Sequence, residues 1–366
     1  MRWIAGAGVI ANAGIIMTGA AVRLSKSGLG CPDWPACTKG SLVAAGTRGD
    51  PIFHTWIEFG NRLLTIAVMV VAAAVLIAAW RFRPGGTRRR DLFWLAVAQP
   101  VAVVAQAVLG GIVVLTKLNP GWVSAHFMVS IAAVAAAVAL WVRSAEGTRP
   151  SRPLVRADLR VLGYGLIGVV AAMLAAGTVV TGTGPLAGAG KVPRYHLPLA
   201  GVTQFHADIG WLIGGLAVAI AVGLQLTRAP QRVVRLGWLM LALVLVQGAI
   251  GYSQYFSGLP AGLVWVHVSD AVLIWVVVLR LSAAMRDRGP VIPLAAAGTP
   301  GTAEAAGTAE AAGTSGTAGA AARAQSGTSG EPATLAESGT AAESGQRATS
   351  AGPEPSSPVQ EPSRTA

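Results

Sequence analysis

Long apolar segments alternate with short polar ones over residues 3–281. Each segment is close to the roughly 20 apolar residues that a helix needs to cross a bilayer, and is too long for a membrane β-strand. The apolar segments lie near residues 3–22, 63–80 (extending back to about Thr55), 92–115, 122–142, 161–181, 203–226, 236–256 and 263–281. The pattern predicts an all-α integral membrane protein with eight transmembrane helices.

The end of the chain has a different composition. From Gly289 to Ala366 it is rich in Gly, Ala, Thr, Ser, Glu and Pro, has no aromatic residue and contains the repeat GTAEAAGTAEAAGT. Such a segment cannot bury enough apolar surface to offset its conformational entropy. We expect a disordered tail over residues 289–366.

Overall composition supports the membrane assignment. Of 366 residues, 53% are hydrophobic and 12% are charged, whereas a soluble domain has about 25% charged residues. A net charge of +12 would suit a nucleic-acid partner. However, arginines cluster at alternate ends of the predicted helices, at Arg2, in loops 81–90, 143–160 and 228–235, and at Arg280, Arg286 and Arg288. The basic excess therefore predicts membrane orientation and not nucleic-acid binding.

Orientation follows from these arginines, because cytoplasmic loops carry an excess of Lys and Arg. Both termini are predicted to be cytoplasmic, in a multi-pass protein of the cell membrane. The two long connections, 23–54 and 182–202, are then external.

An internal repeat divides the chain. Two Gln–Gly–His frames share spacings of 4 and 16 residues: Gln106, Gly110 and His126, then Gln247, Gly251 and His267. Thr-Gly pairs also close the first and fifth helices. The repeat predicts two pseudo-symmetric four-helix halves, 1–143 and 161–288, joined by a cytoplasmic linker at 144–160.

Three histidines lie at similar depth near the external starts of even-numbered helices: His126, His206 and His267. Ionisable groups inside a membrane are costly and usually functional, and neutral imidazole is a common haem ligand. The alternative is a hydrogen bond to a neighbouring helix. Asp208 and Asp270 either orient imidazoles or haem propionates, or are solvated carboxylates. His206 and His267 form a complete pair for a low-spin haem b.

His126 has no obvious histidine partner in its own half. Setting FGN against QFH aligns Asn61 with His206, and the other candidate is His54, seven residues earlier. An amide is a poor iron ligand, so this half has an open or weak axial position. The asymmetry predicts a cofactor half and a substrate half.

Glu58 lies three residues before Asn61, on nearly the same helix face. A carboxylate there is suited to accept a proton or to stabilise positive charge on a substrate carbon. An ion pair with Arg62 or Arg23 is an equally good interpretation.

Both cysteines lie in the run SGLGCPDWPAC of the first external loop. On the oxidising side of the membrane, Cys31 and Cys37 favour a disulfide. A redox-active dithiol is the alternative, and a metal site would need more ligands than the loop offers. His196, in the matching loop, has no cysteine neighbour and is interpreted as a loop residue.

These features together resemble the haem A synthase family over roughly residues 3–281. The resemblance rests on RLSKSGLGCPDWPAC, WIEFGNR, the paired frames and the duplication of four helices. It implies two four-helix bundles and haem b between His206 and His267. It also implies an oxidoreductase acting on a CH or CH2 group, which converts the C8 methyl of haem O to formyl by two hydroxylations with water as oxygen source.

The resemblance also assigns roles in the N-terminal half. His126 matches a ligand of the substrate haem, Glu58 a glutamate assisting the chemistry, and Cys31 and Cys37 a loop pair. Asn61 stands where many members have histidine, so either His126 alone binds the iron or His54 substitutes. The implied partners are haem O, haem O synthase, cytochrome oxidase assembly factors, the lipid bilayer and a second copy of the chain.

Two other functions make distinguishable predictions. A di-haem b electron carrier needs two complete histidine pairs at opposite depths, whereas all candidate ligands here are external and one pair is incomplete. A transporter with parallel repeats needs broken helices and polar groups near the midplane. Only Pro100 and Gln106 hint at these.

Overall fold

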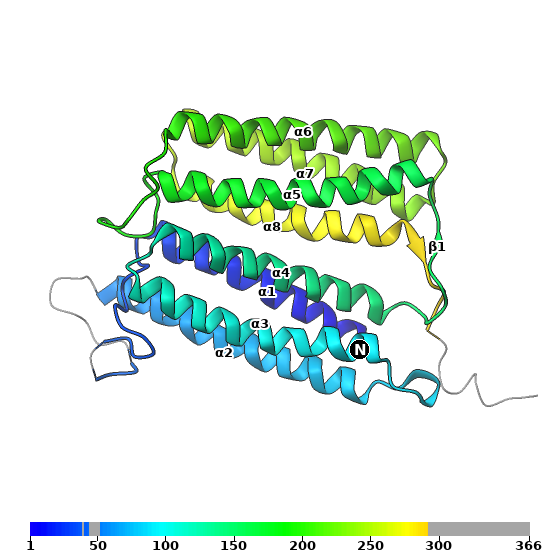
Figure 1. The fold of residues 1–366 in the computed structure, drawn as a ribbon, viewed down its shortest axis with the longest axis horizontal. Helices are drawn as coiled ribbons and strands as arrows, with labels where there is room; N and C mark the ends of the chain where they lie inside the picture. Colours follow the sequence, from blue (N-terminus) through cyan, green and yellow to red (C-terminus); the bar gives the residue numbers. More distant parts are fainter. Residues whose placement is uncertain (39, 44–51, 292–366) are drawn as a thin grey trace, which may run out of the picture. The chain divides into compact units, whose positions relative to one another are not determined.

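The computed structural model describes residues 1–38, 40–43 and 52–291 (Figure 1). Eight long α-helices fill this part of the chain, in agreement with the predicted eight. They are α1 (Arg2–Leu24), α2 (Ile52–Arg81), α3 (Arg90–Leu115), α4 (Pro120–Ser144), α5 (Ala157–Thr183), α6 (Leu199–Leu226), α7 (Gln231–Phe256) and α8 (Ala261–Ala284). Apart from its first three residues, the predicted tail lies outside the described residues.

All eight helices are long and apolar enough to cross a membrane. Many large apolar side chains point outward, among them Trp3, Ile10 and Trp211, each at least 70% exposed. In water such a surface would be unfavourable, whereas in lipid it faces hydrocarbon of the same polarity. The helices therefore confirm an integral membrane protein.

The helices form two groups of four (Figure 1). Sequential neighbours pack together from α1 to α4, and α1 also packs against α4, which closes a ring; α5 to α8 repeat this arrangement. The two groups meet through α1, α4, α5 and α8. Here Trp265 donates to the carbonyl of Met17 (2.9 Å) and buried Trp275 to that of Ile131 (3.0 Å). The arrangement agrees with the predicted pair of four-helix bundles.

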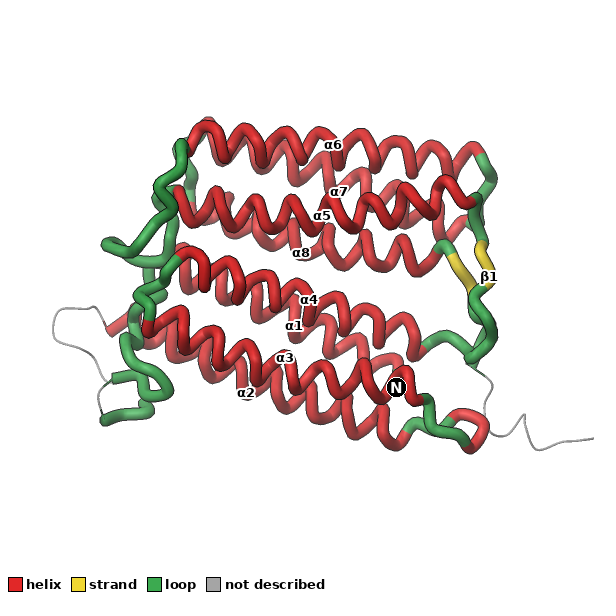
Figure 2. Tube along the Cα trace, in the orientation of Figure 1, coloured by secondary structure: helices red, strands yellow, loops and turns green. Residues whose placement is uncertain are grey.

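A feature that the hydrophobic pattern missed is a two-residue antiparallel ladder between β1 (Arg152–Pro153) and β2 (Arg286–Asp287), visible at one end of the helices in Figure 2. Two further backbone bonds flank it, from Leu154 N to Met285 O (2.9 Å) and from Gly147 N to Gly289 O (2.8 Å). Strands this short carry no periodicity, so sequence patterning cannot reveal them. The ladder ties the linker to the end of α8.

Two helices begin a few residues earlier than the apolar segments. Helix α5 begins at Ala157, within the predicted linker, and α2 begins at Ile52, ahead of the predicted Thr55. In α5 the extra residues include polar ones that the apolar pattern leaves out, and Asp158 among them suits a first helical turn, where it faces the positive end of the helix dipole.

Candidate haem-binding site

The rings of His206 on α6 and His267 on α8 face each other across the second bundle. Their centroids are 6.3 Å apart, and the ring planes are inclined by 57°. A bond between imidazole and a first-row metal is about 2.0–2.1 Å, and the ring centroid lies about 1.1 Å beyond the nitrogen, so two imidazoles on opposite faces of one metal have centroids about 6–6.5 Å apart. The observed spacing fits an iron held between the two rings.

A glycine on the neighbouring helix supports each ring. A Cβ placed on Gly177 of α5 would lie 3.2 Å from Cε1 of His206, and one on Gly251 of α7 would lie 3.3 Å from Cε1 of His267. A side chain at either position would require the imidazole to shift by a few tenths of an ångström. Within the described chain, Nδ1 of both histidines is buried without a hydrogen-bond partner. These are imidazoles held by packing, with unused coordinating capacity, and they fit a haem.

His126 on α4 has the same setting in the first bundle. A Cβ on Gly110 of α3 would lie 3.4 Å from its Cε1. The glutamine of each frame contacts its histidine differently: Gln106 donates to the carbonyl oxygen of His126 (3.0 Å), whereas Nε2 of Gln247 lies 3.4 Å from Nε2 of His267. The predicted repeat thus corresponds to a repeated glycine-to-imidazole contact.

In the first bundle, the position that corresponds to His206 is occupied by Asn61, which pairs with Thr18. Thr18 on α1 donates to Oδ1 of Asn61 on α2 (2.8 Å). Gly14 lies one turn before Thr18, as Gly177 lies one turn before Thr181, but a Cβ on Gly14 would meet nothing within 4 Å. Thr18 and Asn61 also line a cavity of about 290 Å³ between α1 and α2. This position therefore has the equivalent glycine and open space beside it, but an amide where the second bundle has an imidazole.

His54 is held elsewhere. Its Nδ1 lies 2.8 Å from Oγ of Ser27, and its carbonyl oxygen packs so closely on Gly30 that a Cβ there would lie 2.4 Å away. These contacts fix His54 against the loop before Cys31. The geometry favours Asn61 over His54 as the counterpart of His206.

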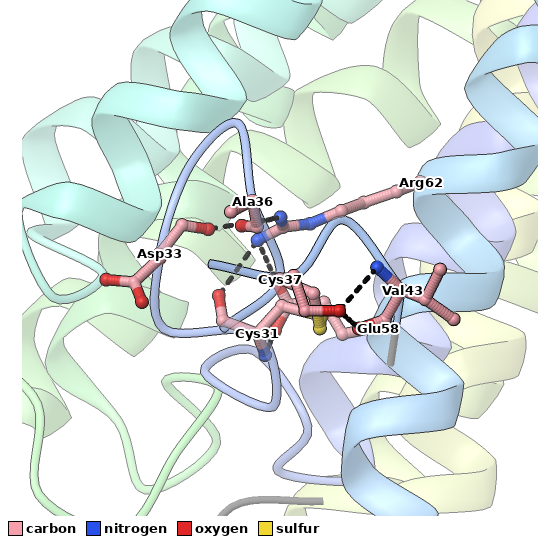
Figure 3. The surroundings of a disulfide bond; sticks show 8 residues. Cys31, Asp33, Ala36, Cys37, Val43, Glu58 and Arg62 are labelled. Carbon is pink, nitrogen blue, oxygen red and sulfur yellow. Dashed lines mark hydrogen bonds and ion pairs between the residues drawn. A yellow bond between two sulfur atoms is a disulfide. The ribbon is translucent and has the colours of Figure 1, made fainter. Parts of the chain in front are cut away.

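Glu58 is buried at 6% exposure, and both of its oxygens are engaged (Figure 3). Oε2 accepts from the backbone N–H of Cys31 (2.7 Å), and Oε1 accepts from Arg62 (2.8 Å). The guanidinium of Arg62 also donates to the carbonyls of Cys31 (2.8 Å), Asp33 (3.1 Å) and Ala36 (3.0 Å). The expected ion pair with Arg62 is present, and it anchors the cysteine loop.

The alternative partner of Glu58 has another role. Arg23 donates from Nε to the carbonyl oxygen of Leu186 (3.0 Å), in the loop after α5. Gly28 N likewise donates to Gly188 O (3.1 Å). Arg23 therefore joins the long loops of the two halves.

The predicted disulfide is present. Cys31 and Cys37 are bonded with an S–S distance of 2.04 Å, and both are buried. The loop between them carries Trp34, whose ring covers Gly111 of α3 so closely that a Cβ there would lie 2.5 Å from it. The disulfide loop thus packs on the first bundle, next to Glu58.

The remaining candidates are not brought to the histidines. Asp208 accepts from Gln204 (2.8 Å). Asp270 is only 7% exposed, contrary to the solvated alternative, and its Oδ2 has no partner in the described chain. His196 is exposed, as expected for a loop residue. The described residues contain no cluster of three or more His, Cys, Asp or Glu suited to a metal ion.

Several contributors were missed at the level of sequence. Gly14, Thr18 and Gly177 carry a signal that could have revealed them, because a glycine precedes the threonine by four residues in both halves. Trp34 had no such signal, since its partner on α3 is remote in sequence. Contacts between helices, unlike spacings along one helix, require the fold.

Known proteins were then compared with the chain. A family model described as "Cytochrome oxidase assembly protein" (COX15-CtaA) matches residues 2–279. Proteins named "Heme A synthase" are similar to it. The one from Geobacillus thermodenitrificans is 32% identical over 29% of this chain and 30% of its own length. Those from Shewanella oneidensis and Halalkalibacterium halodurans are 22% and 26% identical, over 73% and 67% of this chain and 91% and 83% of theirs.

The alignments differ in extent, since those with the first three relatives span only 30–36% of the relatives' lengths. The family model, in contrast, covers all eight helices except the end of α8. The predicted resemblance is therefore confirmed, and the chain belongs to the COX15-CtaA family of cytochrome oxidase assembly proteins, the haem A synthase family.

Proposed function

We propose that this chain is a haem A synthase, which oxidises the C8 methyl group of haem O to a formyl group. The observation that carries the proposal is the asymmetry of the repeat. One bundle has two facing imidazoles at the spacing of a single iron, and the other has one imidazole in the same glycine-supported setting. A resident cofactor in one half and a substrate in the other account for this difference.

In the second bundle, His206 and His267 hold haem b through their imidazoles. When bound, this haem would supply a one-electron carrier. Gly177 and Gly251 position the rings, because each glycine lets its imidazole approach the helix backbone closely. The apolar surroundings of α5 to α8 exclude water from this site.

In the first bundle, His126 would bind the iron of haem O, and Asn61 stands at the position that corresponds to His206 in the second bundle. Conversion of the methyl to formyl, with the oxygen supplied by water in two hydroxylations, releases four electrons and four protons. The electrons must pass on to an external electron acceptor. Glu58 is the carboxylate nearest in sequence and register to Asn61, and it either accepts a proton from the attacking water or stabilises positive charge on the carbon. Its ion pair with Arg62 and its hydrogen bond from Cys31 N–H hold the carboxylate in one orientation.

The direct test is to produce the full chain together with a haem O synthase and to separate the extracted haems by chromatography. We expect haem A in these cells, and only haem O in cells with a His126→Ala variant. Unchanged haem O in the presence of folded wild-type chain would contradict the proposal. That result would support the di-haem b electron carrier instead, because such a protein leaves its haems unaltered.

We further propose that the chain receives haem O from haem O synthase and delivers haem A to cytochrome oxidase assembly factors. The protein would lie in the cell membrane with both termini in the cytoplasm and the disulfide loop outside. The distribution of arginines and the oxidising environment that a disulfide requires both support this orientation.

A further inference from the structure

A pocket rich in arginine lies beside the β-ladder. The ladder lies at the opposite end of the helices from the loop between α1 and α2 (Figure 1). The pocket has a volume of about 110 Å³. Its polar lining comes from the linker, the start of α5, the end of α8 and β2: Ser151, Arg160, Tyr164, Ser282, Arg286 and Arg288. Neither the histidine sites nor the cysteine loop uses this arginine pocket.

The guanidinium groups in the pocket have few partners in the described part of the chain. Nε of Arg160, Arg286 and Arg288 is in each case buried without a hydrogen-bond partner there. Arg288 has one carboxylate nearby, Glu146 at 3.9 Å, but Glu146 already pairs with Arg143 at 2.6 Å.

Arg160 and Arg286 have no acidic partner, since no carboxylate of the described residues lies within 4.0 Å of either. Asp287, next to Arg286 in sequence, instead lies 4.0 Å from Arg232. Burying N–H donors of a charged group without an acceptor is costly. An anion that entered the pocket would remove this cost.

The backbone holds the arginines in place. In the ladder Arg286 pairs with Pro153, and Leu154 N donates to Met285 O (2.9 Å). Arg160 lies in the first turn of α5 and faces the same space. The cationic groups therefore converge without the ordering cost that a loose surface cluster would incur on binding.

We propose that the arginine pocket binds a phosphate group at the membrane surface. Guanidinium groups match phosphate oxygens with paired N–H donors, which a compact ammonium group cannot do. The pocket lies where α5 begins and α8 ends, at the level of a lipid headgroup, and half-exposed Tyr164 beside Met285 is typical of that interface. Basic pockets between membrane helices characteristically bind anionic headgroups.

The same chemistry is offered by an anionic phospholipid and by free phosphate, and an experiment can separate them. Purified full-length protein is placed in nanodiscs of phosphatidylcholine with or without phosphatidylglycerol, and retained lipid is counted by native mass spectrometry. In a second arm, thermal stability in zwitterionic detergent is measured with inorganic phosphate against chloride. Retention of phosphatidylglycerol identifies a lipid as the ligand, and stabilisation by inorganic phosphate alone identifies the free ion. If neither effect is observed, the proposal is overturned.

Variants test the location of the site. The double variant Arg160→Gln, Arg286→Gln should bind about 30-fold more weakly, since each interfacial arginine contributes about 1 kcal/mol. The matched control Arg156→Gln, Arg232→Gln removes the same charge from exposed positions outside the pocket and should bind as wild type does. Equal loss in both would show that net charge alone attracts the phosphate. If the glutamine variant does not fold, the double variant Arg160→Lys, Arg286→Lys can be used, because it keeps the charge but loses the paired N–H donors. Binding of phosphate by this variant with wild-type affinity would overturn the proposal.

Discussion

Glu58 anchors the disulfide loop and is also proposed to assist the chemistry, and replacing one carboxylate oxygen can separate these two roles. Glu58→Gln keeps an oxygen for the N–H of Cys31 but removes the charge that pairs with Arg62. If Glu58 supplies a base or a stabilising charge, production of haem A should fall about 100-fold or more. The spectrum of haem b should not change, because its ligands lie in the other bundle. Haem extraction and an optical spectrum of the same sample measure both.

Arg62→Lys is the control for loop anchoring. It keeps the positive charge beside Glu58 but cannot make the four contacts of the guanidinium. If this variant lost haem A while Glu58→Gln retained it, Glu58 would serve only to hold the disulfide loop.

Asn61 and His206 allow a reciprocal exchange across the repeat. Because a Cβ on Gly14 meets nothing within 4 Å, Asn61→His has room for an imidazole, and the haem in the first bundle should change from high spin to low spin. His206→Asn should do the reverse in the second bundle. Electron paramagnetic resonance of the purified, haem-loaded variants distinguishes the two states.

Thr18→Val tests whether the change of spin state in Asn61→His comes from binding of the imidazole to iron and not from a change in local polarity. It removes the hydroxyl that bonds Asn61 but adds no imidazole, so the first bundle should stay high spin. Two low-spin haems already present in the wild type would mean that another residue, such as His54, supplies the missing ligand.

At the scale of the helix, the sequence pattern predicted those features that depend on a single segment of the chain. Apolar segments of membrane-spanning length identified all eight helices, and the spacing of Gln106, Gly110 and His126 identified the repeat. It could not show that Gly110 supports the ring of His126, since that contact joins two helices. It also left open whether His54 or Asn61 is the counterpart of His206. That choice depends on a hydrogen bond to Thr18, 43 residues away in sequence.

Across the whole molecule, charge and redox chemistry make independent statements about orientation. Arginines gather in the connections after α2 and α4 and around the start of α7, which supports the proposal that this end of the helices is cytoplasmic. The disulfide loop precedes α2, at the opposite end, and a disulfide needs an oxidising compartment. The two arguments share no residue and agree.

Single cysteines can test this orientation, because Cys31 and Cys37 are bonded and buried and so give little background. Lys191→Cys, exposed in the loop after α5, should react with a membrane-impermeant maleimide in intact cells. Arg156→Cys, exposed in the linker before α5, should react only after the cells are permeabilised. The wild-type chain controls for background labelling. The opposite pattern would invert the protein and place the disulfide loop in the cytoplasm, where thiols are kept reduced, so the same experiment decides whether the disulfide can persist in the cell.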